Sequence, residues 1–222
     1  LIVSSPAVSG GSVYVGSGNH KVYAFGPPRV ADLAGFTSSP TNSTLLVIGD
    51  LTNNPHGSKP SGVNYQIGRD MTPLGFVYGM MTNVQDTMFD TNAAVNATTG
   101  RPLSSIPQTL IFSIGGPGIN AVSYYYETTS VVADKAPVRF SMNATHYIWT
   151  DRNGNQVLAV LRSSCNVPPG NTDVFVIQVL QDADGRLVAI MYGTHYTGTW
   201  AAAVYFKFVV YPNISTYSDG FY

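Results

Sequence analysis

The sequence is poor in charged residues. Lys, Arg, Asp and Glu make up 10% of its 222 residues, against roughly 25% in an average soluble domain. The 11 Lys and Arg residues are scattered along the chain. Without a basic cluster to follow a phosphate backbone, nucleic acid is not expected as a partner. A net charge of −1 also gives little repulsion between copies, which favours contact with other protein or glycan surfaces.

Cysteine and long apolar runs are scarce as well. Cys165 is the single cysteine, so the chain cannot form an internal disulfide or a metal site built from several cysteines. No stretch approaches the roughly 18 consecutive apolar residues that a membrane-spanning helix requires. We therefore expect neither a membrane span nor a cysteine-based metal centre.

The common signatures of catalysis are missing too. No G-x-S-x-G motif marks a nucleophile turn, and Cys165 has no neighbouring cation in the sequence to lower its pKa. No two histidines have the local spacing of metal ligands; they are His20, His56, His146 and His195. The sequence therefore predicts a protein that is not an enzyme and that holds no cofactor or metal ion.

What the sequence does contain begins with three short apolar runs, which predict three strands. The runs are residues 5–8, 11–17 and 21–26, and glycine-containing turns separate them. Their pattern, SPAV…GSVYVGS…KVYAFG, resembles one blade repeat of a PQQ-type β-propeller. A propeller closes only with several blades, and the rest of the chain has no second copy. We expect these strands to belong to a longer propeller upstream or to pair with another chain.

The chain is predicted to have three parts. Residues 1–26 are the propeller-like β segment, residues 27–41 are a linker that opens with Pro27 and Pro28, and residues 42–222 are an α/β domain rich in strands. The last part is long enough to bury a sizeable core. An all-β sandwich is the alternative fold for it.

Strands in the α/β domain are predicted from two kinds of pattern. Continuous apolar runs at 44–49 and 109–114 indicate strands that are buried on both faces. Apolar runs that flank Asp/Asn-Gly turns indicate two hairpins, within 145–162 and 173–192.

Helices are predicted from apolar spacing and from capping residues. Residues 53–75 are rich in Asn, Pro, Gly and Ser and indicate a loop. Apolar side chains at three- and four-residue spacings indicate a helix within 76–94, and a shorter one is expected at 119–127. A third helix is expected at 200–209, capped by Gly198-Thr199 and stopped by Pro212.

Three predicted strands run directly into glycine turns, at Gly49, Gly115 and Gly193. In an open α/β sheet such turns meet at the carboxyl edge, where ligands bind to backbone N–H groups and helix N-termini. Asp50, Asn120, His195 and Thr199 would then line a small ligand pocket. The alternative is that glycine only permits the tight turn. Pro117 favours this alternative, because it removes an N–H group that a phosphate would use.

Two hairpin turns present oxygen ligands of the kind that calcium binds. One holds Asp151, Asn153 and Asn155, and the other holds Asp182 and Asp184. Neither continues to the glutamate at the twelfth position of an EF-hand loop. Turn formation explains Asp, Asn and Gly at these places without a metal, so no metal site is assigned there.

Four N-x-Ser/Thr sequons occur, at Asn42, Asn96, Asn143 and Asn213. Such sequons carry glycans in exported proteins. Their number is close to what the abundance of Asn, Ser and Thr produces by chance, so they permit export without requiring it.

A second resemblance comes from glycine motifs in the α/β domain. The segment IGGPGIN at 114–120, followed by YG at 192–193 and GTWAAA at 198–203, is similar to the IGGPxxN…GTxAA pattern of archaeal S-layer and related cell-surface proteins. This resemblance implies an exported α/β surface domain that is often glycosylated and has no catalytic residues.

The function expected from these patterns is that of a secreted structural protein of the cell surface, a subunit of a filament or an S-layer-type array. Residues 1–26 would pair with another copy, because unpaired strand edges accept further strands. Other surface proteins or glycans are further expected partners. The alternative is an extracellular glycan- or ligand-binding module of a larger propeller-containing protein. A quinoprotein-type enzyme is disfavoured, since a single blade lacks cofactor ligands.

Overall fold

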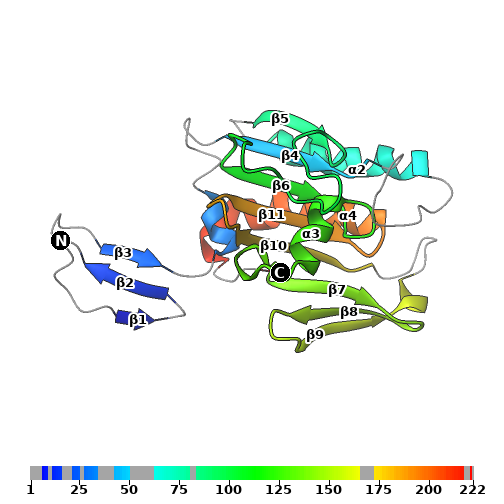
Figure 1. Ribbon diagram of the computed structural model, residues 1–222. Coiled ribbons are helices and arrows are strands. Elements are labelled where there is room, and N and C mark those ends of the chain that lie inside the picture. The colour runs from blue at the N-terminus through cyan, green and yellow to red at the C-terminus, as the bar shows by residue number, and fades with distance from the viewer. Residues whose placement is uncertain are drawn as a thin grey trace.

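The computed structural model describes residues 7–9, 12–16, 22–25, 28–34, 43–50, 63–80, 84–165, 173–217 and 221. The first three ranges, together with residues 63–70 and 84–85, are described by their backbone alone. The strands in these ranges form three separate sheets, of three, five and three strands (Figure 1).

The five-stranded sheet is the centre of the molecule, with the strand order β10-β11-β6-β4-β5. Four of its strands are parallel, and β10 is antiparallel to β11. The strands are β4 (Thr44–Ile48), β5 (Val84–Phe89), β6 (Leu110–Ile114), β10 (Phe175–Gln181) and β11 (Leu187–Gly193). Every residue of β4 and β6 is buried, which confirms the two buried strands that the apolar runs predicted.

Both faces of this sheet are covered. On one face lie α2 (Val63–Tyr78), α4 (Tyr196–Tyr205) and the π-helix η4 (Phe206–Val210); on the other lie α3 (Ala121–Thr128) and the three-stranded sheet β7-β8-β9 (Figure 1). The molecule is therefore a mixed α/β domain, and the alternative of an all-β sandwich is wrong.

The strands of the smaller sheet, and four short helices, complete the domain. The sheet consists of β7 (Val138–Met142), β8 (His146–Asp151) and β9 (Gln156–Leu161). The helices are η1 (Val30–Leu33), η2 (Val132–Asp134), η3 (Arg162–Ser164) and η5 (Tyr211–Thr216). The pairs β8–β9 and β10–β11 are the two predicted hairpins, and their turns contain Gly154 and Gly185 at positive φ.

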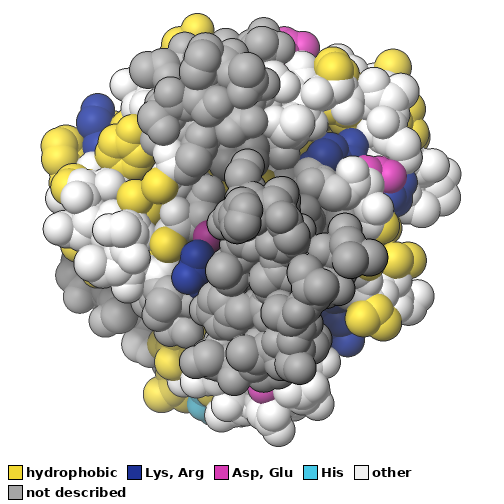
Figure 2. Space-filling model, turned by 90° about the vertical axis from the view of Figure 1, so that its left-hand side faces the viewer, with side chains coloured by type: hydrophobic (Ala, Val, Ile, Leu, Met, Phe, Trp, Pro, Cys, Tyr) yellow, Lys and Arg dark blue, Asp and Glu magenta, His cyan; other side chains and the backbone are white. Residues whose placement is uncertain are grey.

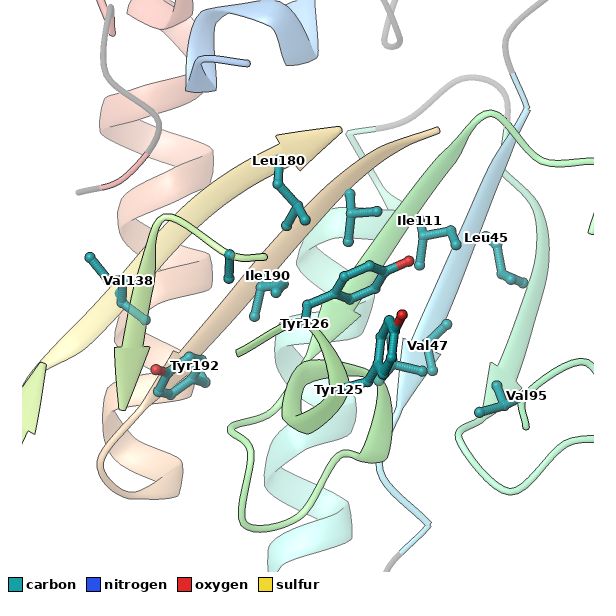
Figure 3. Packing of buried hydrophobic residues seen from close by; sticks show 14 of the residues in the cluster. Leu45, Val47, Val95, Ile111, Tyr125, Tyr126, Val138, Leu180, Ile190 and Tyr192 are labelled. Atoms are coloured by element: carbon teal, nitrogen blue, oxygen red, sulfur yellow. The ribbon is translucent and has the colours of Figure 1, made fainter. Parts of the chain in front are cut away.

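Two packed clusters of apolar side chains hold the layers together. Leu46 of β4 and Phe112 of β6 point to the helices α2 and α4, whereas Leu45 and Ile111 point to α3 and the small sheet. Figure 3 shows the second cluster, in which the rings of α3 lie over the central strands. Because both faces are buried, β4 and β6 are apolar at all positions except Thr44 and Ser113 instead of alternating.

The helix prediction for 76–94 is wrong, and so is the loop prediction for residues 63–75; residues 53–62 lie outside the described residues. The structure has α2 at Val63–Tyr78 and the strand β5 at Val84–Phe89. Pro73 is one of the residues whose abundance in 53–75 predicted a loop, yet it lies inside α2. Leu74 and Val77 of α2 pack on the central sheet, and burial of this kind outweighs local propensity.

The last helix begins earlier and ends later than predicted. Its N-cap is His195 instead of Gly198-Thr199, because a carboxylate from another segment supplies the cap (below). The helical path continues from α4 through η4 into η5, which contains Pro212 near its start. Proline fits the first turn of a helical segment, where its missing N–H costs nothing. The predicted helix at 119–127 agrees with α3.

The three predicted N-terminal strands are present as β1 (Ala7–Ser9), β2 (Ser12–Gly16) and β3 (Val22–Phe25). They form an antiparallel sheet of their own, in the order β1-β2-β3. Within the predicted linker, Val30 and Leu33 of η1 are fully buried in the core of the α/β domain. This part of the linker therefore packs as part of that domain.

Candidate functional site

The glycine turns meet at one edge of the central sheet, as the sequence predicted. In the parallel register, Ile48 lies opposite Ile114, and Ile114 lies opposite Met191. The chain leaves β4 toward α2 on one face, and it leaves β6 toward α3 on the other face. Such a reversal is the place where open α/β sheets usually bind ligands, so this carboxyl edge is the first candidate site.

Asn120 lies at this edge and is fully buried. Its Oδ1 accepts hydrogen bonds from the N–H groups of Val122 and Ser123, at 2.9 and 3.3 Å, and thereby caps α3. Its Nδ2 donates to the carbonyl oxygens of Ile114 and Val47, at 3.0 and 3.4 Å. Asn120 therefore joins β6, β4 and α3, and both ends of its amide are used in doing so.

Asp90 was not identified by sequence reasoning, although it is the central charged group of this edge. The side chain is 2% exposed. One oxygen accepts the N–H of Asp50 and the other accepts the N–H of Ala121, both at 2.6 Å. Its carboxylate therefore sits on the N-terminus of α3, the position that a bound phosphate or carboxylate would occupy. Its position directly after β5 was the available signal, which the erroneous helix prediction hid.

Asp50 belongs to the same end of α3. In addition to the bond from its N–H to Asp90, its carboxylate accepts the hydroxyl of Thr91 at 2.8 Å. Two of the four predicted pocket residues, Asp50 and Asn120, are thus brought to one place. They contribute to a network within the protein that fixes the turn between β4 and the following segment.

The other two predicted pocket residues lie at the N-terminus of α4. Thr199 is buried, and its hydroxyl accepts the N–H of Gly193 at 3.1 Å. Asp173 is the residue that the sequence did not reveal: its carboxylate accepts the hydroxyls of Thr194 and Thr197 and the N–H of Gly198. His195 Nδ1 is 3.9 Å from this carboxylate. A protein carboxylate therefore occupies the N-terminus of α4 as well.

Close packing explains two of the glycines in these turns. A Cβ atom on Gly49 would lie 2.1 Å from the carbonyl oxygen of Ile119, and one on Gly193 would lie 2.3 Å from the Cα of Gly198. Neither contact is sterically allowed, so these turns need glycine for the approach of two backbones. Packing thus accounts for Gly49 and Gly193, and the positive φ of 108° accounts for Gly115.

Cys165 lies near Asp173 and is 2% exposed. Burial raises the pKa of its thiol, and the negative charge of Asp173 raises it further. The reactive form of cysteine is the thiolate. The raised pKa lowers the fraction of Cys165 that is present as thiolate.

The turn between β8 and β9 is closed by its own hydrogen bonds. Asp151 Oδ1 accepts the N–H groups of Asn153 and Asn155, and its Oδ2 accepts the side-chain amide of Asn155, all at 2.8–2.9 Å. These bonds lower the pKa of Asp151, the amide of Asn155 contributing most. The Asp and Asn residues of this turn thus hydrogen-bond to one another and to the backbone of the turn, as these residue types ordinarily do in turns.

The carboxylates in the turn between β10 and β11 form ion pairs with two arginines. Arg186 binds both Asp182 and Asp184 at 2.7 Å, and Arg101 binds Asp184 at 2.8 Å. Arg101 also binds Asp134 at 3.1 Å. Burial lowers the pKa of the Arg101 guanidinium, but its interactions with Asp134 and Asp184 outweigh burial and raise it. The pKa of Asp134 is lowered, against the effect of its burial, by hydrogen bonds from Tyr125, from the N–H of Ala183 and from Arg101. The carboxylates of this turn are thus paired with guanidinium groups. Among the described residues, no group of three or more His, Cys, Asp or Glu side chains has the arrangement of a metal site.

A buried polar network joins the small sheet to the central one. Glu127 of α3, 1% exposed, accepts the N–H of Phe140 and the side-chain amide of Gln178, both at 2.8 Å. Gln178 in turn accepts the N–H of Val138 at 3.0 Å. On the edge of β7 that faces away from β8, these side chains accept the backbone N–H groups that a neighbouring strand would otherwise accept. Burial raises the pKa of Glu127 to about 7, although its hydrogen bonds, including one with Tyr192, act in the opposite direction.

The other side of the small sheet ends in β9, which pairs with β8 and with no further strand among the described residues. Val157, Leu158 and Leu161 of β9 are 46%, 40% and 50% exposed. An apolar groove runs beside this strand toward β10. It is lined by Val138, Trp149, Val157, Leu158, Val174, Phe175, Val176 and Phe221.

Of the four sequon residues, three lie in the described part of the chain, and Asn42 lies outside it. Asn96, Asn143 and Asn213 are all exposed. No helix among the described residues is both long enough and apolar enough to cross a membrane.

Comparison with protein-family models, with curated proteins and with solved structures finds no match for this chain. The resemblances to a PQQ-type blade and to archaeal surface proteins therefore depend on the short motifs alone. Function has to be argued from the structure itself.

Proposed function

We propose that this protein is a secreted structural subunit of a cell-surface filament or S-layer-type array, whose copies join by pairing of β-strands. The observation that carries the proposal is β9, an edge strand with three large apolar side chains that are 40–50% exposed. Monomeric proteins usually protect such edges with charge, proline or a covering segment. In Figure 1, β9 lies on the outside of the molecule.

The N-terminal sheet is the proposed partner of β9. Neither β1 nor β3 has a second strand partner among the described residues. If an edge of this sheet pairs with β9 of the next copy, each subunit has one donor and one acceptor surface. Such a heterologous contact does not close on itself and generates a linear polymer.

The low charge of the surface is consistent with assembly. On the face drawn in Figure 2, the charged side chains of the described residues are few and spread out among hydrophobic and uncharged polar groups. With a net charge of −1, approaching copies meet little electrostatic repulsion.

The alternative of a ligand-binding module is less well supported. Its predicted pocket would use helix N-termini at the carboxyl edge of the sheet, yet Asp90 and Asp173 already occupy them. Asn120 and Thr199 are buried and hydrogen-bonded within the fold. A ligand would have to displace the bonds that hold α3 and α4 in place.

The proposal is tested by electron microscopy and sedimentation of the purified full chain and two variants. Val157→Lys with Leu161→Lys places charge on the apolar edge of β9, and deletion of residues 1–26 removes the donor sheet. Both should abolish polymers and leave the domain folded, since Val157 and Leu161 are half exposed. Val132→Lys is the matched control, because this side chain is 81% exposed on η2.

Ordered polymers that disappear in both variants and persist in Val132→Lys would support the proposal. Polymers that persist after the β9 substitutions would show that the copies join through another surface and not through β9. A full chain that stays monomeric under all conditions would overturn the structural role.

A further inference from the structure

The structure separates the sequons into two kinds. At Asn96 and Asn143 the side-chain oxygen is held by the sequon itself, whereas at Asn213 the side-chain nitrogen is held by the helix before it. We infer that Asn96 and Asn143 are the acceptor sites for N-linked oligosaccharide in the folded protein and that Asn213 is not.

At Asn96 the chain forms a tight exposed loop, closed by the bridge between Val95 and Pro102. Asn96 Oδ1 accepts the N–H of Thr98, the hydroxyl residue of the sequon, and the N–H of Thr99, both at 3.0 Å. Residues 96–99 are all exposed. The amide nitrogen Nδ2 makes no hydrogen bond within the described part of the chain.

At Asn143 the same arrangement recurs in the turn between β7 and β8. Its Oδ1 accepts the N–H groups of Thr145 and His146, at 2.9 and 2.7 Å, and lies 3.2 Å from the hydroxyl of Thr145. The Nδ2 group again has no bond to the described residues, and residues 143–145 are exposed. Two unrelated loops thus present their sequons in one geometry.

This geometry suits the chemistry of N-glycosylation. An amide nitrogen is a weak nucleophile, because its lone pair is delocalised onto Oδ1. Hydrogen bonds to Oδ1 stabilise negative charge there and ease the loss of an Nδ2 proton. Nδ2 then attacks C1 of a sugar carried on a polyprenyl phosphate. The C1–N bond forms, the C1–O bond to phosphate breaks with its electron pair leaving on the phosphate, and a base of the transferase takes the proton.

Asn213 has the opposite arrangement. Its Nδ2 donates to the backbone carbonyl oxygen of Val209 at 3.1 Å, and the backbone carbonyl oxygen of Asn213 accepts the hydroxyl of Thr216 at 2.8 Å. Asn213 lies at a kink inside η5, where its φ of −120° and ψ of 23° depart from helical values, and its side chain reaches back to the carbonyl oxygen of Val209 instead of bonding to the sequon. The nitrogen that would be glycosylated is engaged with the helix.

The inference is tested on the folded, purified chain with a single-subunit oligosaccharyltransferase of N-x-Ser/Thr specificity and a polyprenyl-linked oligosaccharide. Glycopeptide mapping should show Asn96 and Asn143 modified at least tenfold faster than Asn213. Urea-unfolded chain is the control and should bring the rate at Asn213 close to the other two. Thr98→Ala should abolish modification of Asn96 alone, and Thr98→Ser should retain it.

Equal rates at the three sites in the folded chain, or no modification at Asn96 and Asn143, would overturn the inference. Occupancy in the native organism rests in addition on the proposed export. Unmodified protein from the native source, together with fast modification in vitro, would count against export and leave the acceptor geometry intact.

Discussion

The side chain of Asp90, directly after β5, accepts a hydrogen bond of 2.6 Å from the backbone N–H of Ala121, the first residue of α3. The two residues are 31 positions apart in the sequence, and their contact fills the helix N-terminus with a negative charge from the protein itself. Asp173 does the same for α4. The edge of the sheet where α/β proteins commonly bind anions is thereby closed by two internal carboxylates.

Replacement of Asp90 by alanine should lower the free energy of unfolding by about 3 kcal/mol, because two buried N–H groups lose a charged acceptor. The variant should also acquire an anion site. Sulfate should raise its melting temperature more than that of the wild type, since the helix N-terminus would then be open. Thermal unfolding with and without sulfate measures both effects. Asp86→Ala, an exposed position on β5, is the control, and an equal response to sulfate in all three proteins would refute the idea.

Gly49→Ala should destabilise the fold by about 3 kcal/mol or more, because its Cβ would overlap the carbonyl oxygen of Ile119 and neither backbone can move freely. Gly118→Ala is a matched control in the neighbouring motif. A Cβ atom there meets nothing within 4 Å, so the change should stay within about 0.5 kcal/mol. Urea unfolding monitored by circular dichroism gives both values. Similar losses in the two variants would show that packing is not the reason for Gly49.

Glu127 should make the protein less stable as the pH rises through the acidic range. Its pKa is raised to about 7 from an ordinary value of 4.5, so between these pH values the folded state binds more protons than the unfolded state. The stabilisation from this group is complete below pH 4.5 and declines by about 3 kcal/mol by the time the pH has passed 7.

This prediction can be measured directly, because Glu127 is the only glutamate in the sequence. Protein labelled with ¹³C-glutamate should give one side-chain carboxyl resonance that titrates with a midpoint near 7. A midpoint close to 4.5 would contradict the prediction. Urea unfolding across the same pH range should show a shallower decline in Glu127→Gln, which has no carboxyl group to ionise at this position.

Arg186→Ala should be strongly destabilising, by about 3–5 kcal/mol, since it leaves the buried carboxylate of Asp182 without its cation. The exposed pair Arg29–Asp32 provides the contrast. Arg29→Ala should cost less than about 1 kcal/mol, because water screens an exposed ion pair. Chemical denaturation of both variants tests the difference, and comparable losses would argue against a special role for the Arg186 network.

Much of the strand architecture could be predicted from the sequence. The runs at 44–49 and 109–114 are largely apolar, without alternation, because both faces of a central parallel strand are covered. The hairpins were signalled by Asp/Asn-Gly turns, whose glycines need positive φ. These are local rules, in which a residue type and its neighbours suffice.

The sequence was misleading where distant contacts decide the structure. α2 forms around Pro73 because its apolar side chains pack on the central sheet, and β5 is a strand because β4 lies beside it. The predicted pocket residues Asp50, Asn120, His195 and Thr199 were placed at the right edge of the sheet. The carboxylates that occupy the helix N-termini there were missed: Asp90 because its strand was predicted as part of a helix, and Asp173 because no local pattern marks it.

By itself, then, the sequence determined the low charge, the glycine turns, the sequons and the apolar strands, because each depends on composition or on a few neighbouring residues. The tertiary structure decided which groups are already engaged. Two carboxylates fill the helix N-termini, and Arg101 binds a carboxylate of an acidic turn 83 positions away in the sequence. A hydrogen bond depends on distance in space, and residues far apart in the chain come within 3 Å of each other only when the whole domain has folded.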